Sequence, residues 1–188
     1  MEHISEAWLQ PRLEDMMAQF PFPILGFHTD NGSEYINKNV ASMRNKLNVE
    51  QTKSRPGHSS DNGLAETKNG GVVRKHMGYD HIASVHADSI NDFYVEHFNP
   101  YLNFHRPCGV PELKTDKRGK TKRVYKVYAT PLEILLKLPE PRLKEGVTLK
   151  HLEKRAAAES DTGAAMKMRA AKKKLFDHID DCADQRAA

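Results

Sequence analysis

The chain has little cysteine, a single tryptophan and no long hydrophobic run. Its two cysteines, Cys108 and Cys182, are too few and too far apart for a disulfide framework or a cysteine-rich zinc site. No apolar stretch approaches the ~20 residues that a membrane-spanning helix needs. The first residues, Met-Glu-His-Ile-Ser-Glu-Ala, have neither the basic start nor the apolar core of a signal peptide. We therefore expect a protein of the reducing cytoplasm with no membrane partner.

Several site types are also missing from the sequence. No hydrolase nucleophile motif is present. Five histidines of the first part are spread without the paired spacing of a zinc site, namely His76, His81, His86, His97 and His105. The chain contains no internal repeat. An unrelated hydrolase or phosphatase is therefore the function class that the sequence favours least.

Charge is distributed unevenly along the chain. Residues 1–111 contain 10 Lys and Arg against 13 Asp and Glu, whereas residues 112–188 contain 19 against 12. A slightly acidic body with a basic tail suits metal-bound chemistry in one part and attraction of phosphates in the other. A solvated charged surface explains the same charges equally well. We place a domain boundary at residue 111, where the composition changes.

Two acid-bearing segments organise the first part of the chain. The run Ile-Leu-Gly-Phe-His at 24–28 is typical of a buried strand, and it leads to Asp30. A second strand is expected at 49–53, followed by a turn-rich loop and a helix that carries Glu66 in its opening turns. Carboxylates that follow strands of an α/β sheet can converge beyond the strand ends.

Each acid also has an ordinary structural explanation. Asp30 opens an Asp-Asn-Gly tripeptide, which is a common turn. Glu66 lies near a helix start, where the helix dipole favours any acid. The presence of both acids, separated by 35 residues, favours the functional interpretation over these structural ones.

The segments His-Thr-Asp-Asn-Gly-Ser-Glu-Tyr and Asp-Asn-Gly-Leu-Ala-Glu-Thr-Lys-Asn resemble the second and third acid motifs of retroviral-type integrases and DDE transposases. The stretch Asn-Pro-Tyr-Leu-Asn-Phe-His-Arg-Pro at 99–107 resembles the end of that domain in bacterial insertion-sequence transposases. The resemblance covers residues 1–111. It implies an α/β ribonuclease H-like fold and DNA integration or transposition by two-metal phosphoryl transfer.

The resemblance assigns Asp30 and Glu66 as catalytic, metal-binding acids. Mg²⁺ or Mn²⁺ is the implied cofactor, because hard cations prefer oxygen ligands. The family's first Asp and its strand have no counterpart here. We therefore expect an incomplete fold with its leading strands missing, an open apolar edge at 24–28, and no activity of the chain alone. Double-stranded DNA, as element ends and target, is the implied partner. Self-association or a missing N-terminal segment would complete the sheet.

Basic residues near the acids are candidates for contacts to DNA phosphates. The first group follows Glu66 on its helix, although the two glycines at 70–71 weaken that helix and the family's lysine spacing is not reproduced. His58 in the preceding loop is a further candidate. A solvated helix face and a surface histidine explain these residues as well. The first group consists of Lys68, Arg74 and Lys75.

The other helices expected in residues 1–111 are amphipathic. Apolar spacing predicts a helix over 4–19 that begins or bends at Pro11, with Glu14 and Asp15 exposed. An aromatic-rich stripe from residue 88 to 104 predicts a helix packed in the core rather than a base-stacking surface. Pro100 is expected to end or kink this helix.

Residues 112–188 are expected to form a basic hairpin and a helical C-terminal appendage. The hairpin combines a strand to residue 115, an Asp-Lys-Arg-Gly-Lys turn and an alternating strand with two tyrosines. A DNA-backbone platform and a solvated hairpin tip are both compatible with it. A short helix is expected at 131–138, and two polar, peripheral helices are expected at 148–158 and 161–180. The candidate DNA-binding residues of the hairpin are Lys117, Arg118, Lys120, Lys122 and Arg123.

The sequence thus favours the C-terminal part of an insertion-sequence transposase. The alternative is a non-catalytic nucleic-acid-binding or assembly module derived from one, in which the acids have no function.

Overall fold

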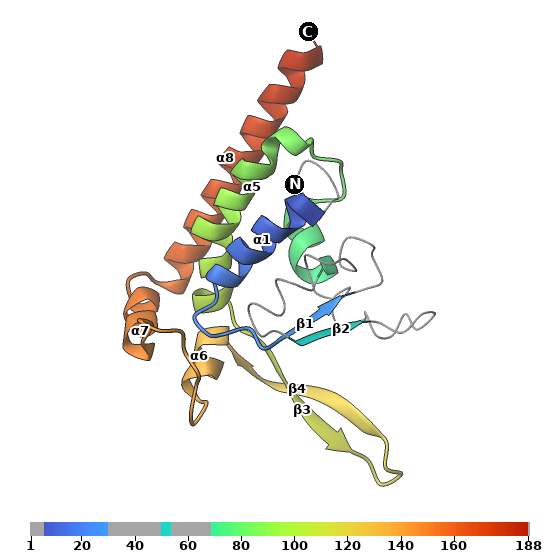
Figure 1. Ribbon diagram of the computed structural model, residues 1–188, viewed down its shortest axis with the longest axis vertical. Coiled ribbons are helices and arrows are strands. Elements are labelled where there is room, and N and C mark those ends of the chain that lie inside the picture. The colour runs from blue at the N-terminus through green and yellow to red at the C-terminus, as the bar shows by residue number, and fades with distance from the viewer. Residues whose placement is uncertain (1–5, 30–49, 54–68, 188) are drawn as a thin grey trace. The chain divides into compact units, whose positions relative to one another are not determined.

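The computed structural model describes residues 6–29, 50–53 and 69–187. These residues divide between two compact units, residues 1–87 and residues 88–188. Helices predominate, and they are accompanied by one parallel and one antiparallel two-stranded sheet (Figure 1). The expectation of a mixed α/β protein is therefore confirmed at this level.

The first helix, α1, spans Glu6–Ala18. Pro11 lies inside it, so the helix neither begins at nor stops at this proline. Pro11 is the sixth residue of α1, so the helix continues through it with one backbone N–H donor fewer. Leu13 is buried, and both Glu14 and Asp15 are exposed as predicted.

The two expected strands of the first unit form a parallel pair. Strand β1 spans Gly26–Thr29 and strand β2 spans Glu50–Lys53. Their register pairs Gly26 with Glu50 and Thr29 with Lys53, so the carboxyl ends of both strands lie at the same edge. No third strand pairs with them among the described residues.

The first unit ends in short helical segments. The π-helix η3 spans Asn69–Arg74 and passes directly into α4, Lys75–Met77. Gly78 then ends the helix at a φ of 83°, a left-handed value that glycine adopts without steric cost. A single 3-10 turn, η4, covers Ser84–His86.

The second unit is built on one long helical stretch. It consists of α5, Ala87–Phe93, then η5, Tyr94–Phe98, and η6, Tyr101–His105, with residues 99–100 also helical. Pro100 does not end the helix, contrary to one of the two expected outcomes. Both neighbouring segments are π-helical, and a π-bulge is one way in which a helix accommodates a local disturbance of its hydrogen bonds.

The aromatic side chains of this stretch form the core of the second unit, as predicted. Phe98 has no exposed surface and Phe93 is 4% exposed. Their rings stack with centroids 5.7 Å apart, and Tyr94 meets Phe98 edge-on at 5.2 Å. The five-residue separation of Phe93 and Phe98 suits the wider π turn that begins between them. Val95 on the same helix is 44% exposed, so only one face is packed.

The hairpin follows directly. Strand β3 spans Cys108–Thr115, strand β4 spans Thr121–Ala129, and the two are antiparallel. Helix α6, Pro131–Leu136, follows at the position predicted for it. The sequence prediction was correct here because the turn residues and the alternating strand are local signals.

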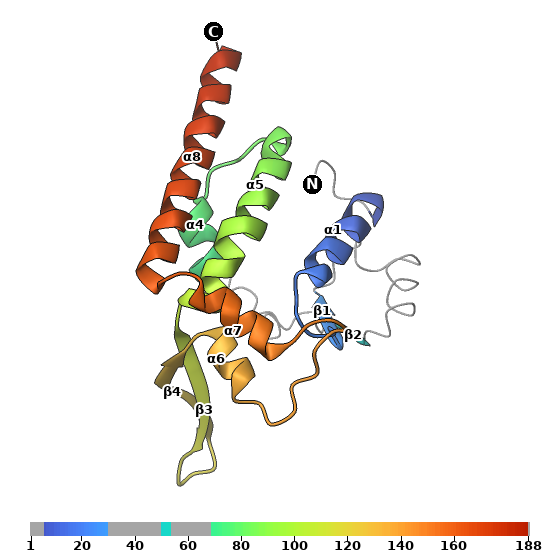
Figure 2. The same ribbon diagram turned by 90° about the vertical axis from the view of Figure 1, so that its left-hand side faces the viewer.

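The two last helices are α7, Leu149–Ala157, and α8, Asp161–Ala187. The expectation that they are peripheral is wrong for α8, which packs against η5 and η6 (Figures 1 and 2). It buries Ala164, Met168 and Leu175. The stretch 88–105, which the sequence groups with the first part of the chain, therefore shares a core with a helix beyond residue 111.

Among the helices of the described ranges, none is both long enough and apolar enough to cross a membrane.

Candidate nucleic-acid interface

The two candidate catalytic acids lie outside the described residues. Asp30 and Glu66 fall in the ranges 30–49 and 54–68, and so do His58 and Lys68. Strand β1 ends at Thr29, the residue directly before Asp30. Convergence of the two acids and binding of Mg²⁺ or Mn²⁺ by them stay predictions.

Arg74 and Lys75, the other candidates of this group, lie where η3 passes into α4, and both are exposed. The Arg74 guanidinium carbon lies 5.5 Å from the centre of the Tyr79 ring, a cation–π distance. Tyr79 is itself 82% exposed. A contact at such an exposed site leaves Arg74 accessible to solvent or to a phosphate.

The β3–β4 hairpin carries the largest group of candidate residues, and we refer to residues 108–129 as the ribbon. Between Pro111 and Tyr128 it has seven Lys and Arg but two acids. Every residue from Pro111 to Arg123 is exposed. All five predicted DNA-binding residues of the hairpin therefore lie at its surface.

The cations of the ribbon tip are presented by an ordered turn. Asp116 closes it, because its Oδ1 accepts hydrogen bonds from the backbone N–H groups of Arg118 at 2.9 Å and Lys120 at 3.0 Å. Gly119 adopts a φ of 77°, which a side chain would oppose. Asp116 is one of the two acids of the ribbon, and its carboxylate is thus hydrogen-bonded to the backbone of the turn. Since Asp116 binds N–H groups of the turn, its carboxylate helps to fix how the neighbouring cations are presented.

Cross-strand pairing determines which side chains share a face. One face carries the pairs Leu113–Arg123 and Pro111–Tyr125. Leu113 is 73% exposed and Tyr125 is 52% exposed, although both are large apolar or aromatic side chains. The Tyr125 ring lies over Gly109, where an added Cβ would stand 3.0 Å from Tyr125 Cδ1. This face is therefore aromatic and apolar, with a single cation.

The opposite face carries the pairs Glu112–Val124 and Lys114–Lys122. Lys114 was part of the basic stretch recognised in the sequence, but its position directly across from Lys122 follows only from the register. A bulge shifts this register between Val110 and Pro111, which leaves Lys126 without a Cα partner on β3. Bulges increase the local twist of a ribbon.

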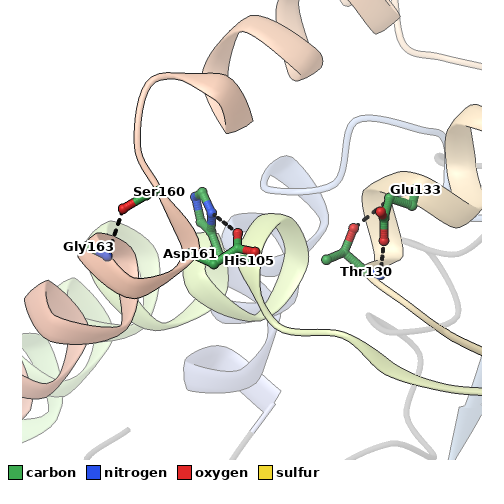
Figure 3. Close-up of polar contacts among 6 residues, drawn as sticks. All are labelled: His105, Thr130, Glu133, Ser160, Asp161 and Gly163. Atoms are coloured by element: carbon green, nitrogen blue, oxygen red, sulfur yellow. Dashed lines mark hydrogen bonds and ion pairs between the residues drawn. The ribbon is translucent and has the colours of Figure 1, made fainter.

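Both ends of the ribbon are anchored in the helical core of the second unit (Figure 3). Before β3, the His105 Nδ1 lies 3.0 Å from the Asp161 carboxylate at the start of α8. After β4, the Thr130 hydroxyl accepts from the Glu133 N–H at 3.2 Å and the Glu133 carboxylate accepts from the Thr130 N–H at 2.6 Å. Ala129 and Thr130 are buried. The base of the ribbon is thus fixed while its distal half is exposed.

The Thr130–Glu133 box was readable from the sequence, because Thr-Pro-Leu-Glu is a standard helix start. The contact between His105 and Asp161 was not, since 56 residues separate them and no local pattern links them. In the close-up, the Ser160 hydroxyl caps the start of α8 as the Thr130 hydroxyl caps α6. The Ser160 Oγ accepts from the Gly163 N–H at 3.1 Å (Figure 3).

The other titratable groups of the described residues give little indication of a functional site. Burial raises the pKa of the Tyr94 phenol, so this side chain stays neutral. Cys108 and Cys182 are free thiols. In residues 6–29, 50–53 and 69–187, no group of three or more His, Cys, Asp or Glu side chains is placed to hold a metal ion.

Comparison with known proteins identifies one relative without a functional name. The chain is 33% identical over 75 residues to the uncharacterized protein y4rM of Sinorhizobium fredii. The match covers 40% of this chain and 21% of the relative, so the chain spans about a fifth of the length of the curated relative it matches. No family model matches the chain. No solved structure matches it either.

Proposed function

We propose that this chain is the C-terminal part of an integrase-type transposase, which acts on double-stranded DNA in the cytoplasm. The observation that carries the proposal is the pair Asp30 and Glu66, which are separated by 35 residues and stand in the two segments that resemble the family's acid motifs. The parallel pairing of β1 and β2 supports it, because β1 ends at the residue before Asp30. Ligand sites of open α/β sheets lie beyond the carboxyl ends of strands.

The finer fold that goes with this proposal is an incomplete ribonuclease H-like sheet. In it, β1 and β2 are neighbouring strands whose carboxyl ends share an edge. The apolar run at 24–28 is compatible with a strand that is covered on both faces once the sheet is complete. Self-association or a segment from outside residues 1–188 would supply the strands that complete it.

The chemistry of the two side chains fits a hard divalent cation. Asp30 and Glu66 offer carboxylate oxygens, the ligands that Mg²⁺ and Mn²⁺ prefer. When bound, such ions supply charge stabilisation and orientation for phosphoryl transfer. The role of the chain is to bring the acids together and to position the DNA backbone through its cations. Since the resemblance assigns two of three acids to this chain, we expect activity only when a further segment provides the third.

Complementation tests the proposal. The chain is co-expressed with the polypeptide encoded directly upstream, and cleavage and joining of duplexes carrying the element ends are measured with Mg²⁺. We expect activity from the pair and none from either part. Asp30→Asn and Glu66→Gln should each abolish it. Asp61→Asn is the matched control, because Asp61 opens the second Asp-Asn-Gly but is not assigned to the site. Continued inactivity of the soluble pair would count against the proposal.

A second function, a non-catalytic DNA-binding or assembly module, is favoured by the exposed basic ribbon. In this case the ribbon binds DNA and the two acids contribute nothing. Duplex binding that is unaffected by Asp30→Asn, Glu66→Gln and the removal of Mg²⁺, together with an inactive complemented pair, would select this function over the first.

A further inference from the structure

Two lysines of the ribbon face each other without a counter-charge. Lys114 and Lys122 are directly paired across β3 and β4, and both are exposed. Directly opposite residues of an antiparallel pair have Cβ atoms about 5 Å apart. Like charges in this arrangement are destabilising. The pair therefore works against the stability of a two-stranded ribbon, which is a marginal structure in water.

Nothing in the described part of the chain neutralises these two ammonium groups. The ion pairs found there do not include Lys114 or Lys122. Glu112 shares their face and is two residues from Lys114, but its direct partner is Val124. Asp116, the other acid of the ribbon, is engaged by two N–H groups of the turn.

We propose that Lys114 and Lys122 together bind one backbone phosphate of duplex DNA. An anion placed between the two ammonium groups converts their repulsion into two attractions, and each ammonium brings three hydrogen-bond donors. This inference rests on the DNA partner of the proposed function, but it does not require the acids Asp30 and Glu66.

The surroundings of the pair favour a polyanion over a single anion. The tip beyond it carries Lys117, Arg118 and Lys120 within one ordered turn, so cations continue along the ribbon from the pair. Phosphates recur along a DNA strand, and each one neutralised by a cation releases counterions. The pair is then the innermost of a series of phosphate contacts, held at a defined separation by the β register.

The test uses the full chain and a labelled DNA duplex, with affinity measured by fluorescence anisotropy between about 50 and 200 mM salt. The variants are Lys114→Gln, Lys122→Gln and the double substitution. The matched control is the double Lys150→Gln, Lys154→Gln, which removes two exposed cations spaced i,i+4 on α7. Both double variants lose the same charge and relieve one like-charge pair. The double Lys114→Arg, Lys122→Arg keeps the charge of the ribbon face.

We expect the ribbon double variant to lower the salt slope by about 0.9, the value for one phosphate contact, and to weaken binding about eightfold at 0.1 M salt. Each single substitution should leave most of the slope in place, because the remaining lysine still contacts the same phosphate. The Lys150 and Lys154 variant should bind DNA as the wild type does, and the double arginine variant should keep the slope. Without DNA, Tm should rise in the ribbon double variant.

Three results would overturn the inference. If the ribbon double variant binds like the α7 control, the ribbon face does not contact DNA. If the two single losses multiply in the double variant, the lysines bind separate phosphates. If inorganic phosphate raises Tm as much as the duplex does, the pair is a site for small anions. Repeating the binding assay with Asp30→Asn, Glu66→Gln protein separates failure of this inference from failure of the proposed function, because the acids should not affect it.

Discussion

Replacing Phe98 with alanine should remove a large share of the stability of the second unit. Phe98 has no exposed surface, stacks on Phe93 with ring centroids 5.7 Å apart and meets Tyr94 at 5.2 Å. Truncation of a buried phenylalanine costs about 3–5 kcal/mol, from lost transfer free energy and from the cavity that remains. Total stabilities of domains are about 5–15 kcal/mol, so this one change is a substantial fraction.

The effect is measurable by urea unfolding and by hydrogen exchange. With an m-value of about 2 kcal/mol/M, a loss of about 4 kcal/mol lowers the midpoint by about 2 M. Because η5 packs against α8, amide protection should fall along both helices. Val95→Ala is the control on the same helix, since Val95 is 44% exposed, and it should shift the midpoint little.

Equal effects of Phe98→Ala and Val95→Ala would refute the assignment of Phe98 to the core. Loss of protection in η5 alone, with α8 unchanged, would refute the shared packing of the two helices. The second result would also remove the reason for placing α8 within the folded unit rather than at its periphery.

Three further predictions concern the ribbon and its anchors. Thr130→Ala removes the hydroxyl that caps α6 and should cost about 1 kcal/mol in urea unfolding, whereas Thr130→Ser should cost much less. Asp116→Ala removes two acceptor contacts of an exposed turn, so amide exchange at Arg118 and Lys120 should accelerate, and Asp116→Asn should preserve most of the protection. Because burial raises the pKa of Tyr94, the neutral phenol is retained longer in the folded state, and stability should fall as pH rises above the ordinary value of 10.0. Tyr94→Phe should reduce this alkaline loss, as measured by unfolding at pH values on both sides of 10.0.

Local signals allowed the sequence to predict most elements. The Asp-Lys-Arg-Gly-Lys turn has its acid, its glycine and its flanking alternation within one short segment, and the hairpin formed as expected. Strands β1 and β2 lie within a residue or two of the expected positions. Their parallel pairing joins segments about 24 residues apart, which is the separation that a crossover connection requires.

Long-range packing was not predictable from the sequence. Helix α8 is rich in lysine and alanine, a composition typical of a solvated helix, yet Met168 and Leu175 are buried. Its position is linked to the end of η6 through His105 and Asp161, which no local pattern connects. Pro100 does not end the helix, which was one of the two expected outcomes, because the usual effect of proline applies to an α-helical hydrogen-bond register, whereas the segments beside it are π-helical.

The ribbon and the core of the second unit are stabilised by different residues, and this separation bears on function. Core side chains such as Phe98 and Met168 are buried in the helices, whereas Leu113, Tyr125 and Tyr128 on the ribbon are each more than half exposed. Burial in a core therefore accounts for the apolar side chains of the helices, but it does not account for the exposed apolar side chains of the distal ribbon. A two-stranded ribbon that exposes apolar groups and opposes two lysines is poorly explained by stability of the free chain. The proposed contact with duplex DNA would supply phosphates to the lysine face, and a ribbon that enters the major groove would place its aromatic face beside base edges and thymine methyl groups.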